Sequence, residues 1–213
     1  MKSPSGFAQP PRIAVWLLNL FALEEEGESV LGDLLEEFSI LASKSGVSFA
    51  RRWYWRQTVK TLPQLAGVGF RSAPLLTTTA IIGGFLLRKL VGPLVGPAMF
   101  AVLEWCKVYE RHFTTYIFFA STGIDIAHLV TFLVIGFLAA LAAKGREMIA
   151  TITLGFIFAS MAIVAIVYVV SSTGDSAILR RFPWYASDSF AIVIAGAIVK
   201  THRLGASAGP SKA

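Results

Sequence analysis

The pattern of hydrophobic positions divides the chain into two parts. Up to about residue 63, apolar residues recur every three or four positions, as they do on one face of an amphipathic helix. Beyond that point apolar residues run on almost without interruption, and no charged residue occurs from 72 to 87 or from 148 to 173. The pattern therefore predicts an all-α fold: an integral membrane helical bundle of about four transmembrane helices, preceded by a short cytoplasmic or interfacial three-helix region.

The first part predicts three helices, at residues 13–21, 28–44 and 48–62. Gly46 is a suitable stop after the second helix, and Pro63 is expected to end the third because proline cannot donate a backbone hydrogen bond. Residues 1–9 are interpreted as a flexible leader, and 10–63 as an amphipathic prefix region. A cleaved signal peptide is rejected, since no small-residue cleavage site follows the first short apolar run.

The second part, residues 64–203, predicts the transmembrane bundle. Its four apolar stretches lie at about 67–91, 124–143, 148–171 and 182–199. A membrane-crossing helix needs roughly 17–25 mostly apolar residues, so all four qualify. Residues 204–213 are interpreted as a flexible tail.

The segment between the first two stretches is the least regular. Two Gly-Pro pairs, at 92–93 and 96–97, favour a break in the helix, and several charges between 104 and 111 interrupt any long apolar run. We interpret 92–123 as a loop with an interfacial helix. An additional span within 90–124 is the alternative.

Composition supports a membrane protein. Hydrophobic residues make up 55% of the chain and charged residues only 15%, whereas soluble domains carry about 25% charged residues. The net charge of +6 does not indicate nucleic-acid binding, because Lys and Arg collect on the cytoplasmic side of membrane proteins. With four spans, thirteen of the 19 Lys and Arg residues fall on one side, and six, including Arg88 and Lys89, fall on the other. This asymmetry predicts a multi-pass membrane protein with both termini in the cytoplasm.

The run 51–56 predicts a membrane-interface anchor. Its aromatic rings prefer the boundary between membrane and water, and its cations can reach anionic lipid head groups. The expected anchor residues are Arg51, Arg52, Trp53, Trp55 and Arg56. Membrane lipids are therefore expected partners.

Three acidic or histidine residues fall inside the predicted spans. Asp125 and His128 are one helical turn apart, and Asp188 lies early in the fourth stretch. Because burying ionisable groups in lipid is unfavourable, such residues are candidates for a polar intramembrane site near the outer ends of the spans, with Glu104 or His112 as further members. The alternative is structural: Asp125 caps its helix or pairs with His128, and Asp188 hydrogen-bonds within the bundle.

No motif indicates catalysis. HExxH, Gly-x-Ser-x-Gly and Walker sequences are absent, and Cys106 is the single cysteine. We therefore expect no enzyme, no catalytic residues, no cofactor and no metal site. Small-xxx-small patterns, such as those beginning at Gly92, Gly136, Gly155 and Ala191, favour close helix packing and are compatible with a homo-oligomer.

Three motifs resemble one known family. The runs 10–18 (PPRIAVWLL), 30–38 (VLGDLLEEF) and 52–57 (RWYWRQ) are similar, in order and spacing, to the permease prefix domain of type 2. That segment precedes the first span in bacterial ABC-exporter permeases of the macrolide-exporter kind. The resemblance covers residues 10–62 only, and the chain resembles the short, stand-alone members that lack the transporter. It implies a bacterial inner membrane and a link to export, and it carries over no site residue.

Two functions follow as expectations. The favoured one is an accessory or regulatory membrane protein, whose prefix docks an ABC-type permease or another membrane protein. The alternative is a small transporter or channel that uses Asp125, His128 and Asp188 in a polar intramembrane cavity. An intramembrane enzyme ranks last because no nucleophile or metal set can be assembled.

Overall fold

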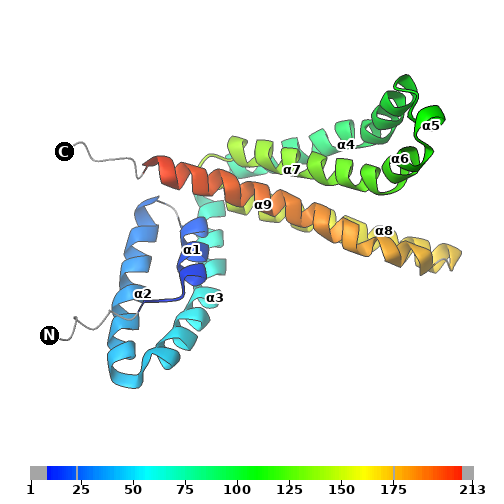
Figure 1. The fold of residues 1–213 in the computed structure, drawn as a ribbon. Coiled ribbons are helices and arrows are strands. Elements are labelled where there is room, and N and C mark those ends of the chain that lie inside the picture. Colours follow the sequence, from blue (N-terminus) through cyan, green and yellow to red (C-terminus); the bar gives the residue numbers. More distant parts are fainter. Residues whose placement is uncertain (1–8, 23, 175, 208–213) are drawn as a thin grey trace. The chain divides into compact units, whose positions relative to one another are not determined.

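The computed structural model describes residues 9–22, 24–174 and 176–207. Within these ranges the chain is helical and contains no β-strand, which confirms the predicted all-α helical bundle. The chain forms two compact units, Met1–Pro74 and Leu75–Ala213. Figure 1 shows both units along the colour gradient of the sequence.

The first unit contains α1 (Arg12–Phe21), α2 (Glu24–Ser45) and α3 (Val47–Ser72). In Figure 1, α2 and α3 form a helical hairpin with α1 beside them. Gly46 makes the sharp turn between α2 and α3 with a φ of 87°, a value that glycine adopts without strain. The amphipathic faces meet in a core of its own, which consists of Ala14, Leu18, Phe38, Ala50, Tyr54 and Leu65.

Pro63 does not end the third helix, contrary to the prediction from sequence. α3 continues through it to Ser72, so the boundary between the units falls at Pro74 instead of residue 63. Pro63 lies on the exposed side of the helix. Carbonyl groups that lose their N–H partner there remain accessible to other donors, which makes the proline tolerable.

Among the described residues, the second unit contains four helices that are long and apolar enough to cross a membrane. The first is α4 (Pro74–Trp105). The second, Phe113–Ala142, joins α6 (Phe113–Phe118), the π-helical segment η1 (Phe119–Gly123) and α7 (Ile124–Ala142). The third is α8 (Glu147–Thr173), and the fourth, Ser176–Gly205, joins η2 (Ser176–Arg181) to α9 (Phe182–Ser207).

The first two spans differ from the predicted ones. α4 runs straight through Pro93 and Pro97, and the second span begins at Phe113, so the connection between them is short and contains only α5 (Val108–Arg111). The expected loop at 92–123 and first span at 67–91 are therefore wrong. Proline is tolerated in membrane helices because neighbouring groups and local adjustments satisfy the freed backbone atoms. Arg88 and Lys89, expected in an outer segment, consequently lie inside α4.

Small residues let α9 pack closely against α7 and α8. A Cβ atom at Gly136 would lie 2.7 Å from the Cα of Ile192, and one at Gly155 would lie 3.0 Å from the carbonyl oxygen of Ser189. The predicted small-residue patterns that begin at Gly136 and Gly155 thus coincide with tight helix contacts. These contacts hold α7, α8 and α9 together around the core residues Phe132, Ile135, Ala139, Leu154, Ala191 and Ile192.

A buried carboxylate connects α8 to α9 at one end of this bundle. The Glu147 side chain is fully buried at the start of α8 and forms an ion pair with Arg203 of α9. Glu147 also accepts a hydrogen bond of 2.8 Å from the backbone N–H of Gly145, and Arg203 donates one to the carbonyl oxygen of Leu141. The turn between α7 and α8 is therefore fixed to the last turns of α9.

The expected terminal segments are only partly described. Residues 1–8 of the predicted leader and residues 208–213 of the predicted tail lie outside the described residues. The predicted start of the tail is wrong, because α9 continues to Ser207.

Candidate functional site

Helices α4, α7 and α9 bring an arginine, a histidine and two aspartate side chains around one cavity of the second unit. Arg88 comes from α4, Asp125 and His128 from α7, and Asp188 from α9. We call this space, of about 250 Å³, the polar cavity. Its other lining residues are Phe132, Arg181, Trp184 and Tyr185.

The site lies closer to the middle of the spans than the sequence pattern predicts. Arg88, His128 and Asp188 are each close to the midpoint of their long helix, namely Pro74–Trp105, Phe113–Ala142 and Ser176–Gly205. The expectation of a site near the outer ends arose because the predicted second and fourth spans began too late, at residues 124 and 182 instead of 113 and 176. Because the helices begin earlier, through α6 and η2, the same residues move towards the centre of the bundle.

The four ionisable groups face one space without pairing directly. No ion pair or hydrogen bond connects Arg88, Asp125, His128 and Asp188, all of which belong to the described part of the chain. His128 Nδ1 and Arg88 Nε are buried and have no hydrogen-bond partner among the described residues. Buried polar atoms are nearly always hydrogen-bonded in native proteins, so these two groups call for an explanation.

The structural alternative for Asp125 is not observed. Gly123, the residue before α7, has helical backbone angles, and no side chain caps the helix at this position. The helix instead continues backwards through the π-helical segment η1 into α6. Short π-helical segments within α-helices occur often at functional sites.

Arg88 is the central residue that the sequence pattern missed. Its guanidinium carbon lies 4.7 Å from the centre of the Phe132 ring, a cation–π arrangement. The guanidinium group also covers Gly92 one turn further along α4, in the space that a side chain there would need. The sequence does contain a signal for Arg88, because apolar segments lie on both sides of this basic residue. The hydrophobic pattern alone, however, places Arg88 at the end of a predicted span.

A second cavity adjoins the first. This adjoining cavity, of about 310 Å³, shares Arg88, Phe132, Tyr185 and Asp188 with the polar cavity. Its remaining lining residues are Lys89, Phe158, Met161, Ala162, Ala165 and Ser189. Arg88 and Asp188 thus lie between the charged polar cavity and the more apolar adjoining cavity.

Other expected members of the site lie elsewhere. Glu104 and His112 are exposed near the connection between α4 and α6 and do not line either cavity. Among the described residues, no group of three His, Cys, Asp or Glu side chains is arranged to hold a metal ion.

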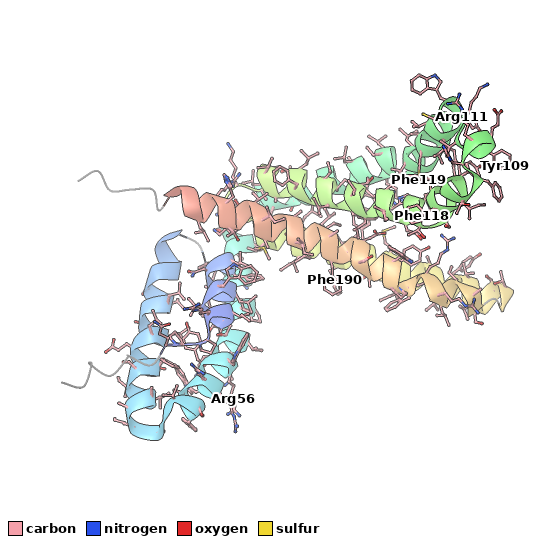
Figure 2. The ribbon with its side chains drawn as sticks, viewed as in Figure 1. Arg56, Tyr109, Arg111, Phe118, Phe119 and Phe190 are labelled. Carbon is pink, nitrogen blue, oxygen red and sulfur yellow. The ribbon has the colours of Figure 1, made fainter. Side chains whose placement is uncertain are left out.

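The expected anchor residues lie on α3 of the first unit, and they separate into two sets. Arg51, Arg52, Trp55 and Arg56 are exposed, and Figure 2 shows Arg56 projecting away from the helix. Trp53, by contrast, packs against the core of the unit. The exposed part of the expected anchor is therefore a stripe of three arginines and one tryptophan.

Tyr54, between the two tryptophans, is completely buried. Its ring contacts Phe38 edge to face at 5.8 Å, while its hydroxyl group has no hydrogen-bond partner among the described residues. Burial raises the pKa of this phenol above its usual value of 10.0, because the charged form is poorly solvated there.

Comparisons of the chain with protein-family models, with curated proteins and with solved structures found no match.

Proposed function

We propose that the chain is a membrane protein that binds a small polar solute or an ion within its second unit, and that it works as a small transporter or channel. The observation that carries this proposal is the arrangement of Arg88, Asp125, His128 and Asp188 around one cavity near the middle of three long apolar helices. Ionisable residues at this depth are unfavourable in lipid, and in membrane proteins they usually mark a substrate or ion pathway.

Flux measurements on reconstituted protein test this proposal. Purified protein is placed in lipid vesicles that contain a pH-sensitive dye, and proton movement is followed after a gradient of pH, Na⁺ or K⁺ is imposed. We expect flux above that of protein-free vesicles, and we expect Asp188→Asn to abolish it. Glu104→Gln is the matched control, because it removes an exposed carboxylate of the same unit that lines neither cavity.

Two results contradict the proposal. One is wild-type flux no faster than that of empty vesicles under every gradient. The other is an unchanged flux in Asp188→Asn, which would show that the polar cavity is not on the pathway.

A second candidate is an accessory or regulatory protein of an ABC-type permease or another membrane complex. It is supported by the first unit, which has a core of its own and carries the three motifs that resemble a permease prefix. In this case the first unit docks the partner. Solubilisation of native membranes in a mild detergent, followed by purification of this chain, should recover the partner, whereas recovery of this chain alone or as a homo-oligomer would contradict the candidate.

The proposal includes a bacterial inner-membrane location with both termini in the cytoplasm. The excess of Lys and Arg on one side supports this orientation. The ion pair of Glu147 with Arg203 joins the turn between α7 and α8 to the last turns of α9, which is consistent with both segments lying on the same side of the membrane. An alkaline phosphatase reporter inserted after Cys106 should be active outside the cytoplasm, and one inserted after Gly145 should be inactive.

A further inference from the structure

We infer that the polar cavity binds a small organic anion: a carboxylate group on an apolar body. This inference rests on the proposed function and specifies its ligand. Arg88, Arg181 and Trp184 can only donate hydrogen bonds, whereas Asp125 and Asp188, when ionised, can only accept them.

Of the two buried polar atoms of the cavity without a partner among the described residues, His128 Nδ1 and Arg88 Nε, the second indicates the chemistry of the ligand. The buried Nε–H of Arg88 is a donor, and neither carboxylate of the cavity accepts a hydrogen bond from it. A buried donor without an acceptor is unfavourable. The ligand that satisfies it must therefore offer an acceptor, and a guanidinium group binds a carboxylate through two parallel hydrogen bonds.

The surroundings of Arg88 hold the guanidinium group in place for such a ligand. One side is covered by the Phe132 ring at 4.7 Å, and the group also packs over Gly92. A planar group held by packing loses less entropy when it binds. Arg181 lines the same cavity and supplies a second positive charge.

The size and walls of the cavity limit the rest of the ligand. A volume of about 250 Å³ lies below the range of about 300–1,000 Å³ that is typical of pockets for drug-sized molecules. Three of the lining residues, Phe132, Trp184 and Tyr185, are aromatic. The cavity therefore suits a ligand of about the size of one substituted ring, with an apolar face.

The negative charge of the two aspartates predicts the direction in which a substitution should change binding. An incoming carboxylate is repelled by Asp188, so removal of this negative charge should strengthen the binding of an anion. A site for cations requires the opposite, since Asp188 would then be a ligand. The effect of Asp188→Asn on binding consequently separates the two possibilities.

The experiment uses three probes of nearly equal size and different charge. The thermal unfolding midpoint of the full chain, purified in detergent, is measured with sodium benzoate, with benzyl alcohol and with benzylammonium chloride, all at equal ionic strength. We expect benzoate alone to raise the midpoint in a saturable manner. Arg88→Gln should weaken benzoate binding by at least about tenfold, because a charge-assisted pair of hydrogen bonds is lost, and Asp188→Asn should strengthen it.

Matched variants allow the binding test to be made even if Arg88→Gln does not fold. Arg180 and Arg181 are both exposed, but only Arg181 lines the cavity. Arg181→Gln should therefore weaken benzoate binding, and Arg180→Gln should leave it unchanged. If Arg88→Gln does not fold, this pair together with Arg88→Lys decides the question. Stabilisation by benzylammonium that depends on Asp188, or no effect of benzoate on the wild type, overturns the inference.

The outcomes also separate this inference from the proposed function. Benzoate binding without flux under the pH, Na⁺ and K⁺ gradients, and without benzoate uptake into the same vesicles, would contradict transport and leave the anion site standing. Flux that depends on Asp188, in a protein on which benzoate has no effect, would support transport and overturn the anion site.

Discussion

The guanidinium group of Arg88 occupies the space in which a side chain on Gly92 would lie. Substitution of Gly92 by alanine therefore forces Arg88 to move, although alanine itself favours a helix by up to about 1 kcal/mol over glycine. We expect Gly92→Ala to keep its helix content, measured by circular dichroism, and to lose most of the stabilisation by benzoate. Gly83→Ala is the control, because a Cβ atom at this position of the same helix would have no heavy atom within 4 Å. Equal benzoate responses in the two variants would contradict this role of Gly92.

Gly136 tests the contact between α7 and α9. A Cβ atom at Gly136 would lie 2.7 Å from both the Cα and the carbonyl oxygen of Ile192, and backbone atoms cannot move aside as a side-chain end can. Gly136→Ala should therefore destabilise the protein by about 1–3 kcal/mol, the usual effect of overpacking. Gly83→Ala should be neutral or stabilising in the same thermal unfolding assay. Similar midpoints for the two variants would show that the helices separate easily.

The pair of Glu147 and Arg203 allows a double-mutant cycle. Arg203→Gln leaves a fully buried carboxylate without its guanidinium partner and should lower the free energy of unfolding by about 2 kcal/mol. Glu147→Gln should destabilise less, because Arg203 is partly exposed and can turn to solvent. The double variant should be more stable than the sum of the single effects predicts. Strict additivity, measured by thermal or chemical unfolding, would exclude direct coupling.

Tyr54 should make the first unit sensitive to alkaline pH. Below about pH 10 the phenol is protonated in both folded and unfolded chains, so its full contribution to stability is present there. As the pH rises past 10.0, the unfolded chain releases the proton first, because burial raises the pKa in the folded state. Stability contributed by Tyr54 is therefore lost as the pH rises towards the higher folded pKa.

Tyr54→Phe should remove this loss and preserve stability at neutral pH, since the buried hydroxyl makes no hydrogen bond with a described residue. The measurement is the thermal midpoint between about pH 8 and 11 for both proteins. Tyr109→Phe, at an exposed position, is the control. A parallel decline in wild type and Tyr54→Phe would locate the alkaline sensitivity elsewhere.

The exposed arginines of α3 should hold the first unit against anionic lipid. Each basic residue near such a surface contributes about 1 kcal/mol, so Arg51→Gln, Arg52→Gln and Arg56→Gln together should strongly weaken attachment. In vesicles with anionic lipid, the triple variant should be cleaved faster by subtilisin near Lys60 than the wild type. In neutral vesicles the two proteins should be cleaved alike, and cleavage independent of lipid charge would contradict the anchor.

The tryptophans of the anchor should behave differently from each other. Trp55→Ala should act like loss of an arginine, because Trp55 is exposed, whereas Trp53→Ala should destabilise the unit, because Trp53 packs against its core.

Much of the fold was predictable from local pattern. The helical periodicity predicted α1 and α2 to within a few residues, and uncharged apolar runs predicted four long membrane-type helices. The turn at Gly46 was also predicted, because its chemistry is local. The continuation of α3 and α4 through prolines was missed, since the tolerance of a proline depends on what surrounds the freed backbone groups.

The candidate site was predictable only in part. Asp125, His128 and Asp188 were identified because charges within apolar runs are unusual, and the structure brings them to one cavity. Arg88 was missed because its role depends on contacts with Phe132 in another helix and on the space above Gly92. The pairing of Glu147 with Arg203 was likewise missed, because nothing in the local sequence links residues so far apart.

The π-helical segment η1 makes the second span a helix with a hinge. A wider turn within an α-helix weakens its regular hydrogen bonding and is a known place for bending. Asp125 and His128 follow immediately after η1, and α6 precedes it. Bending there would move α6 relative to α7, while α7 stays packed against α9 at the tight contact of Gly136.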